Sequence, residues 1–509
     1  AFQSWLRRKY QTLDELNARW GTIFWSHVYT DWSQIPLPWS QARTANPGLA
    51  LDYRRFMSDT YRAFQQLQID AIRQRCPHHF ITHNLMGFNY PNLNYFEMAE
   101  PLDFVAWDNY PRGFWELKPG VDVSGLALGH DAMRSLKHQN FWVMEAQSGP
   151  AGWEIVGLMP RPGEIRLWAY QGIAHGADGI VFFRWRTCRF GTEQYWHGVL
   201  DHDGRPRRRY AEVQRMGQEI RRIGEQIVGA AVRAEVAMLL SYDTRFAFQA
   251  QPNNPRLDYP AHFATYYAAL HRKNVSVEIV SPADDFSDYK LLIAPALYVV
   301  DQALVDRLRA FAGNGGTVIF TARSGVKDAA NTVVDQPLPG LLADLCGVEV
   351  TEYDSLGEEM TNPLRFEHSQ VRAGGGAAGI WCDVLEPTTA EVVASYTKDY
   401  YAGRPAITVN RFGRGRAIYV GTIGDDDLAQ TVIGWASELA GVQPVLETPA
   451  PVEATARWQG DRRLLFVLNH GDEPQPVSLD GDYVDLISSE ARSGRVTLPP
   501  KEVLILSER

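Results

Sequence analysis

The sequence predicts an α/β protein that begins with part of a parallel barrel and continues into two further domains. The chain has 509 residues, which is enough for two or three domains. Within the first 185 residues, segments of strand and helix character alternate four times, as in a parallel sheet covered by helices. Each of these strands ends in polar or charged residues, which is typical of a barrel whose site lies on its C-terminal face.

The elements of the first domain, residues 1–229, follow from apolar periodicity. Helices are predicted over residues 1–20, 51–75, 131–137 and 164–175, with a second helix start at Thr12 in the first of these. Strands are predicted over 80–83, 104–107, 141–144 and 179–184, parallel and in that order. Four strands make half of an eight-stranded barrel and leave two edges unpaired. We therefore expect the C-terminal half of a (β/α)8 TIM barrel, with the other half upstream of Ala1.

The remaining chain predicts two smaller folding units. Over residues 230–447, strands at 236–240, 276–280, 290–294 and 317–321 alternate with helices at 260–272 and 302–312. This alternation favours a doubly wound α/β domain. We expect an exposed glycine-alanine loop at 374–379, a return strand at 413–421 and a last helix at 428–440. Over residues 448–509, short alternating runs at 463–469, 483–487 and 503–506 predict a small antiparallel β domain.

Composition and charge exclude several classes of protein. The net charge of −10 gives no basic surface for nucleic acid. No apolar run approaches the length of a membrane span. The four cysteines lie far apart without metal-ligand spacing, which favours a reducing, cytoplasmic location and indicates no metal or other cofactor in this chain. Eleven of the fifteen tryptophans lie in the first 185 residues. Tryptophan in such numbers favours carbohydrate binding, because indole faces pack against the C–H faces of sugar rings.

Glu145 is the leading candidate for a catalytic residue. It ends the apolar run Phe141-Trp-Val-Met-Glu145, just before a Ser-Gly-Pro turn. A carboxylate at this place suits a strand cap on the surface equally well. Trp153, Arg186 and Glu193 shift the balance, because aromatic and charged groups together suit a sugar ring. Glycoside hydrolysis with retention needs a nucleophile and an acid/base carboxyl group about 5 Å apart.

Glu145 suits the role of nucleophile in such a pair. Tyr110, after the preceding strand, is expected to hydrogen-bond to it, and Arg186 to keep it ionised. The residues leave three candidates open for the second carboxyl group: Asp108, Glu154 and Glu193. Asp108 is equally well explained as a polar group that forms hydrogen bonds within the core.

Several motifs together resemble glycoside hydrolase family 42, the β-galactosidases. They are Ala1-Phe-Gln-Ser-Trp-Leu, Trp20-Gly-Thr, Phe24-Trp25-Ser, Trp107-Asp-Asn-Tyr-Pro111, Phe141-Trp-Val-Met-Glu145, and Phe183-Arg-Trp-Arg186 with Arg189-Phe-Gly and Glu193. The resemblance covers essentially the whole chain. It implies a catalytic (β/α)8 barrel, an amidotransferase-like domain that forms a homotrimer, and a C-terminal β domain. Because Cys346 ends a helix rather than a strand-to-helix elbow, the middle domain is expected to be structural.

The resemblance also implies roles for individual residues. Glu145 matches the family's nucleophile. The residues expected to bind the galactoside substrate are Tyr110, Trp153, Trp25, Glu193 and His197, to which the reasoning above adds Arg186 and Asp108. In this family the acid/base glutamate follows an asparagine at the end of the fourth barrel strand, and a zinc-binding cysteine cluster, where present, lies in the same half. Both are expected upstream of this chain.

Three hypotheses follow. The leading one is a retaining β-galactosidase that acts on short galactosides as a homotrimer, with its acid/base residue upstream. A close variant prefers α-L-arabinopyranosides. A hypothesis of a different class is a non-catalytic sugar-binding trimer.

Overall fold

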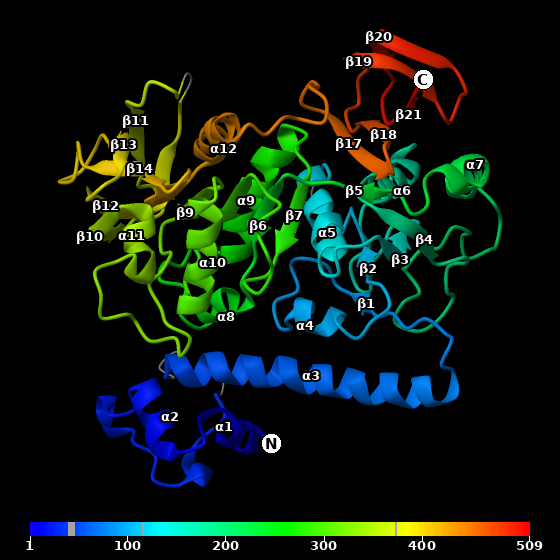
Figure 1. Cartoon of the computed structure of the whole chain (residues 1–509). Coiled ribbons are helices and arrows are strands. Elements are labelled where there is room, and N and C mark those ends of the chain that lie inside the picture. The colour runs from blue at the N-terminus through cyan, green and yellow to red at the C-terminus, as the bar shows by residue number, and fades with distance from the viewer. Residues whose placement is uncertain (39–45, 114–116, 118, 372–373) are drawn as a thin grey trace.

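Three sheets organise this protein in a computed structural model that describes residues 1–38, 46–113, 117, 119–371 and 374–509. Figure 1 shows a four-stranded parallel sheet at the right, an eleven-stranded sheet at the left and a six-stranded sheet at the upper right. The N-terminal helices lie below the first two sheets in this view. The chain therefore forms one α/β assembly, in which successive segments build successive sheets.

Three helices open the chain: α1 (Phe2–Tyr10), α2 (Leu13–Trp20) and α3 (Pro47–Arg75). Two 3-10 turns lie between them, η1 (Phe24–Ser26) and η2 (Trp32–Gln34). The side chain of Thr12 accepts a hydrogen bond from the amide of Glu15, which confirms the predicted second helix start. The 29-residue helix α3 contacts α4 (Tyr95–Ala99) beside the parallel sheet and α8 (Tyr242–Ala250) of the central domain, so it connects the two along one side of the molecule.

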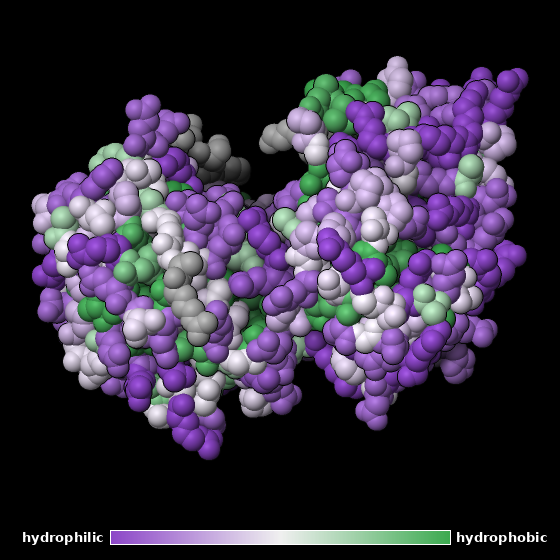
Figure 2. Space-filling model, turned by 90° about the horizontal axis from the view of Figure 1, so that it is seen from above, coloured by the Kyte–Doolittle hydropathy of each residue, from purple (hydrophilic) through white to green (hydrophobic). Residues whose placement is uncertain are grey.

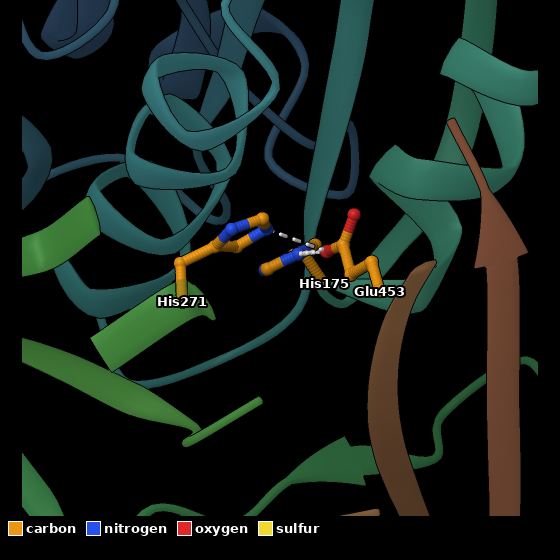
Figure 3. Close-up of side chains that lie close together, drawn as sticks. All are labelled: His175, His271 and Glu453. Atoms are coloured by element: carbon orange, nitrogen blue, oxygen red, sulfur yellow. Dashed lines mark hydrogen bonds and ion pairs between the residues drawn. The ribbon is translucent and has the colours of Figure 1, made fainter. Parts of the chain in front are cut away.

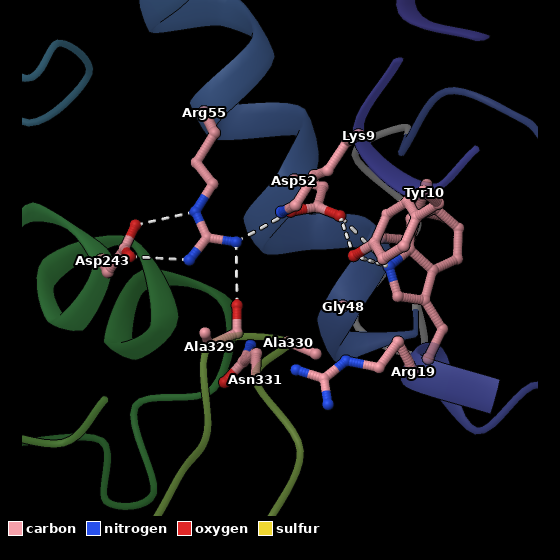
Figure 4. Close-up of polar contacts among 12 residues, drawn as sticks. Lys9, Tyr10, Arg19, Gly48, Asp52, Arg55, Asp243, Ala329, Ala330 and Asn331 are labelled. Carbon is pink, nitrogen blue, oxygen red and sulfur yellow. Dashed lines mark hydrogen bonds and ion pairs between the residues drawn. The ribbon is translucent and has the colours of Figure 1, made fainter. Parts of the chain in front are cut away.

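A buried cluster of charges joins α3 to the central domain (Figure 4). Asp52, only 1% exposed, accepts a hydrogen bond from Tyr10 at 2.6 Å and pairs with Lys9. One turn further on, Arg55 donates to Asp52 at 2.9 Å and makes two hydrogen bonds of 2.8 and 2.7 Å to Asp243. Because an unpaired buried charge is costly, Arg55 holds the helix and the central domain in one relative position.

The parallel sheet consists of β1 (Asn84–Leu85), β2 (Ala106–Asn109), β3 (Phe141–Gln147) and β4 (Ala177–Phe183). Its helices are α4 (Tyr95–Ala99), α5 (Val123–Ser135), α6 (Glu164–Ala174) and α7 (Arg208–Ile223), followed by the 3-10 turn η3 (Gly224–Gln226). All four strands are parallel neighbours in sequence order, which confirms the predicted arrangement.

Two predicted elements of this sheet are wrong in their limits. Residues 80–83 form no strand, because the amide of Ile81 donates to the side chain of Asp103 instead of to a neighbouring strand, and β1 begins only at Asn84. The helix predicted from residue 131 begins at Val123, where the side chain of Asp122 accepts a hydrogen bond from the amide of Gly125. Carboxylates that accept hydrogen bonds from backbone amides therefore override the apolar pattern at both places, and only the one of Asp122 is a helix cap.

The central domain contains all the strands and helices that the sequence predicts there, and more. Its first strands β6 (Val236–Leu239), β7 (Val277–Val280), β8 (Leu291–Ala294) and β9 (Thr317–Thr321) pair in parallel. Its helices are α8 (Tyr242–Ala250), α9 (Tyr259–Arg272), α10 (Gln302–Gly313), the turn η4 (Gly340–Leu342), α11 (Ala343–Cys346) and α12 (Asp426–Ala440).

An antiparallel extension of this sheet escapes the sequence analysis. It comprises β10 (Val348–Ser355), β11 (Asn362–Phe366), β12 (Ala377–Pro387), β13 (Glu391–Tyr396) and β14 (Pro405–Phe412), with β15 (Gly415–Val420) joining it to β9 and β16 (Thr422–Gly424) pairing with β12. The loop expected over 374–379 is wrong in part, because β12 begins at Ala377, which pairs with Pro363. Much of β12 is buried without regular alternation, so the period-2 signal is absent.

The C-terminal sheet has the order β20-β19-β21-β18-β17-β5. Its strands are β5 (Ala231–Val232), β17 (Val452–Gln459), β18 (Arg462–Asn469), β19 (Gln475–Asp485), β20 (Ala491–Leu498) and β21 (Val503–Glu508). The strands from β17 onward pair antiparallel with one another, as predicted. The edge strand β5 lies at the start of the segment 230–447, so the C-terminal sheet also holds the beginning of that segment.

Figure 2 shows the side of the molecule on which α12 and the C-terminal strands lie. Most of this side is hydrophilic, and a hollow separates its two lobes. Within the described ranges, no helix combines the length and the apolar composition that crossing a bilayer requires.

Arg457 of β17 ties the C-terminal sheet to the parallel sheet. Its side chain is fully buried and donates to Asp178 at 2.6 Å, to the carbonyl of Ile173 at 2.8 Å and to that of Ala230 at 2.8 Å. We predict that Arg457→Met lowers stability by about 3–5 kcal/mol, because it removes the charge partner of the mostly buried Asp178 carboxylate together with the hydrogen bonds to the two carbonyls. The midpoint of urea denaturation measures this loss.

A matched control for that prediction is Arg404→Met. Arg404 also pairs with a carboxylate, Glu386, at 2.7 Å, but both side chains are about half exposed. Its removal should change stability by less than about 1 kcal/mol. Equal midpoints for the two variants would contradict the role given to Arg457.

Candidate active site

Polar side chains from three neighbouring strands meet at the carboxyl edge of the parallel sheet. Asn84 lies on β1, Asp108 on β2 and Glu145 on β3. A register irregularity after Trp107 places Asp108 opposite Glu145 in the ladder between β2 and β3. The sequence analysis expected Glu145 at a strand end, whereas the strand continues for two more residues to Gln147.

Glu145 is held by hydrogen bonds from two different strands. The hydroxyl of Tyr110 donates to Glu145 Oε2 at 2.6 Å, as the sequence analysis expected. The side-chain amide of Asn84 lies 3.5 Å from Glu145 Oε1 and 3.1 Å from Asp108 Oδ1. One amide therefore bridges both carboxyl groups, and the Glu145 side chain is fixed in one orientation.

The two carboxyl groups, Asp108 and Glu145, have different surroundings. Burial and the neighbouring Glu145 carboxylate raise the pKa of Asp108 to about 7, although the amide of Asn84 opposes this shift. Burial and the hydrogen bond to Glu145 raise the pKa of Tyr110 far above its usual value, so its hydroxyl remains a donor. The site thus combines a readily protonated carboxyl group with one that accepts a hydrogen bond from a tyrosine.

Asp108, Tyr110 and Glu145 line a pocket of about 640 Å³, which is a usual size for a small-molecule site. Six of the described residues that line it are aromatic. The ring centroid of Trp196 lies 4.7 Å from that of Tyr110 and 5.4 Å from that of Trp153, with Phe183 at 6.0 Å. Aromatic faces beside carboxylates suit a ligand with an apolar face and many hydroxyl groups, such as a sugar.

The charged pair of the pocket is Arg184 with Glu193, which form an ion pair at its rim. Arg186, expected to keep Glu145 ionised, points elsewhere and donates to the carbonyl of His202 at 2.9 Å. Arg184 directly follows β4 and lines the pocket, whereas Arg186 forms an isolated bridge with Leu200 in the chain that returns after it. The expectation for Arg186 is corrected accordingly.

Three other predicted residues lie outside the residues that line this pocket. Trp25 is 66% exposed in η1, where it stacks on Phe24. His197 lies behind the pocket wall, its Nδ1 within 3.1 Å of the carbonyl of Pro150, and burial lowers its pKa. Glu154, one candidate for the second carboxyl group, is exposed. Of the three candidates, Asp108 and Glu193 line the pocket.

A larger pocket of about 770 Å³ adjoins the first and shares Asn89 and Asp122 with it. Its acidic residues are explained by the fold, since Asp122 and Asp258 cap helices α5 and α9 and Asp426 lies in the first turn of α12. Its arginine, Arg245, donates to backbone carbonyls. We assign the reaction to the smaller pocket, because Asp108 and Glu145, which lie opposite each other in the ladder, both line it.

Sequence reasoning missed three residues of the site: Asn84, Arg184 and Trp196. Asn84 and Arg184 lie within segments that were recognised as polar strand ends. Trp196 follows Glu193 by three residues, and the concentration of aromatic residues was the signal that pointed to it. Their convergence depends on the ladder and on the 185–200 loop folding back, which periodicity does not reveal.

Models of three consecutive domains match this chain. The model described as Beta-galactosidase matches residues 1–223, the Beta-galactosidase trimerisation domain matches 234–443, and the Beta-galactosidase C-terminal domain matches 451–508. The chain is 37% identical to Beta-galactosidase BgaP of Planococcus sp. (strain L4), over 100% of this chain and 76% of that protein. The chain belongs to glycoside hydrolase family 42, the β-galactosidases.

Solved structures of family 42 β-galactosidases share this fold. The crystal structure of the enzyme from Bacillus circulans sp. alkalophilus gives a TM-score of 0.95 at 35% identity and covers 100% of this chain and 76% of that chain. The cold-adapted enzyme from Rahnella sp. R3 gives 0.93 at 31% identity and covers 100% and 75%. All three sheets of this family 42 protein therefore have counterparts in known glycosidases.

The raised pKa of Asp108 predicts a pH dependence of stability for this family 42 protein. Well below pH 3.8, the usual pKa of aspartic acid, Asp108 is protonated in both the folded and the unfolded chain. As the pH rises to about 7, only the unfolded chain ionises freely, so the folded state loses stability. Asp108→Asn should therefore gain about 1–3 kcal/mol relative to the parent between pH 4 and pH 8, measured from urea midpoints. Parallel pH curves for the two proteins would refute the shift.

Proposed function

We propose that this protein is a retaining β-galactosidase in which Glu145 forms the covalent glycosyl-enzyme. The observation that carries the proposal is the position of Glu145, which a tyrosine hydroxyl holds at 2.6 Å beside a second carboxyl group in an aromatic pocket. Family membership supports hydrolysis of β-galactosides. The relatives named β-galactosidase that match the whole chain support galactose as the sugar.

In this proposal each described group has one task. Glu145 attacks the anomeric carbon of galactose and displaces the aglycone, and water then releases the sugar from the enzyme. Tyr110 keeps the attacking carboxylate oriented. Trp153 and Trp196 pack against the apolar face of the ring, and the Arg184–Glu193 pair binds hydroxyl groups at the rim.

We also propose that the parallel sheet is the C-terminal half of a (β/α)8 barrel, and that an upstream glutamate is the acid/base residue. One face of the sheet packs on α5 and α6, while the apolar side chain of Val181 on β4 remains 41% exposed. The relatives extend beyond the matched region, since this chain covers 76% of BgaP. A glutamate from a facing strand would lie across the sugar from Glu145, as retention requires.

The first test replaces the nucleophile in the full-length gene product. We predict that Glu145→Ala lowers kcat on an activated β-D-galactoside by roughly 10⁴-fold or more, because no covalent intermediate can form. Azide should partly restore turnover and give a galactosyl azide of inverted configuration, which NMR identifies. Glu193→Ala serves as control, because it should mainly raise KM and gain nothing from azide. Parent-level activity in Glu145→Ala would disprove the assignment.

A second test asks whether the acid/base residue is Asp108 or an upstream glutamate. Loss of the acid/base group slows substrates with poor leaving groups far more than activated ones. If Asp108 only positions Glu145, Asp108→Asn should slow lactose and an activated aryl galactoside by the same factor. A loss at least about 100-fold larger on lactose would make Asp108 the acid/base residue and remove the need for an upstream one.

We propose further that the protein is a homotrimer formed through residues 230–447. The trimerisation-domain model over 234–443 supports this assembly. The turn around η1 offers additional surface to another chain, because Ile23 is 80% and Trp25 66% exposed. Light scattering of the full-length protein should give three times the mass of one chain. The mass of a single chain at working concentration would count against the trimer.

A further inference from the structure

Each of the three sheets, or the helices that cover it, contributes one side chain to a small buried space that shares no lining residue with the sugar pocket. His175 follows α6 beside the parallel sheet, His271 lies on α9 of the central domain, and Glu453 lies on β17 of the C-terminal sheet. Figure 3 shows both imidazole rings directed toward the same carboxylate. No single segment of the chain contains this arrangement, and the sequence analysis expected no metal site here.

The three groups have the chemistry and spacing of metal ligands. His175 Nε2 lies 2.5 Å and His271 Nε2 lies 3.3 Å from Glu453 Oε1, and all three ligand atoms fall within 4.8 Å of one another. Two histidines and a carboxylate are a ligand set that Zn²⁺ takes in proteins. Zinc–ligand bonds of about 2.1 Å in a tetrahedron separate the ligands by about 3.3 Å, so His175 and Glu453 need to part by roughly 1 Å.

Outer contacts orient two of the three groups. His175 Nδ1 lies 2.8 Å from a carboxylate oxygen of Asp131, which leaves Nε2 directed at Glu453. The second oxygen of Glu453 accepts hydrogen bonds from Gln171 at 3.0 Å and from His470 at 2.7 Å, which leaves Oε1 directed at the two histidines. A carboxylate behind a ligating histidine is the usual way in which proteins fix the tautomer and angle of such a ligand.

A small cavity and a buried ring nitrogen without a well-aligned hydrogen bond also fit a bound ion. A cavity of about 20 Å³ is lined by His175, His271 and Glu453 together with Asp131 and Tyr267, and a space of this size holds one water or one ion. The Nε2 atom of His271 is buried without a well-aligned hydrogen bond, although it lies near Glu453. The His271 side chain is 15% exposed, so the cavity lies close to solvent.

We propose that His175, His271 and Glu453 form a site for a divalent transition-metal ion of the zinc type, which ties the three sheets together. The metal replaces the proton that His175 otherwise shares with Glu453, and that proton goes to the buffer. A water in the cavity completes the coordination.

The alternative occupant of the gap is that proton. A proton on His175 also balances the cluster, because its two ring nitrogens lie 2.8 Å from Asp131 and 2.5 Å from Glu453. Metal and proton therefore compete for the same nitrogen, Nε2 of His175.

The test uses full-length protein that has been stripped with a chelator and dialysed against Zn²⁺ or Co²⁺. The parent should bind one ion at this site. His271→Ala should bind that ion about 100-fold or more weakly. His271 makes no well-aligned hydrogen bond in the cluster, so the variant should fold. The matched control is His262→Ala, which removes another buried histidine of α9 that contacts only Thr321 among the described hydrogen bonds. Its affinity should stay within threefold of the parent.

The absorption spectrum of bound Co²⁺ distinguishes this site from a cysteine site elsewhere in the full-length protein. Nitrogen and oxygen ligands give visible ligand-field bands without the near-ultraviolet thiolate band of a cysteine site. The proposal requires these bands in the parent and in His262→Ala, and their loss in His271→Ala. Equal metal content and equal spectra in the parent and His271→Ala overturn it, as does a parent that binds no ion outside cysteine sites, in which case the proton holds the junction.

Discussion

Charged groups buried between domains fix how the parts of this chain sit relative to one another. Arg55 joins α3 to the central domain through Asp243, and Arg457 joins the C-terminal sheet to the parallel sheet through Asp178. Glu453 meets histidines of both other domains. A buried charge is tolerated only beside its partner, so each contact permits a single arrangement of the elements that carry it. Apolar packing alone permits small sliding motions that these pairs exclude.

The fixed position of the domains matters for the candidate site, because its side chains come from separate strands and loops that must keep their spacing. Asn84, Asp108 and Glu145 keep their spacing through the ladder of β1, β2 and β3. The helices behind that ladder pack on α9 of the central domain and on β17 of the C-terminal sheet. A sugar site built to stabilise one transition state benefits from such a frame, since small displacements of a nucleophile cost much of its rate.

How well the sequence predicted each site residue depended on how far apart the interacting residues lie in the sequence. Glu145 and Tyr110 were predicted together because each follows a recognisable strand, and the hydrogen bond between them is present. The same reasoning chose Arg186 where the pocket takes Arg184, because a shift of two residues along an extended segment leaves the sequence pattern unchanged. Trp25 shares motifs with the family but lies outside the pocket of its own chain. No periodicity links Trp196 to Tyr110.

The sequence by itself determined the parallel order of β1 to β4, the doubly wound start of the central domain, and the choice of Glu145. These features follow from short-range patterns of apolar and polar residues, which act on the local chain. Only the tertiary structure decided that Asp108 is buried against Glu145, that β10 to β14 extend the central sheet, and that His175, His271 and Glu453 meet. Those outcomes depend on the packing of segments that lie far apart in the sequence, and on burial, which changes the charge that a group prefers to carry.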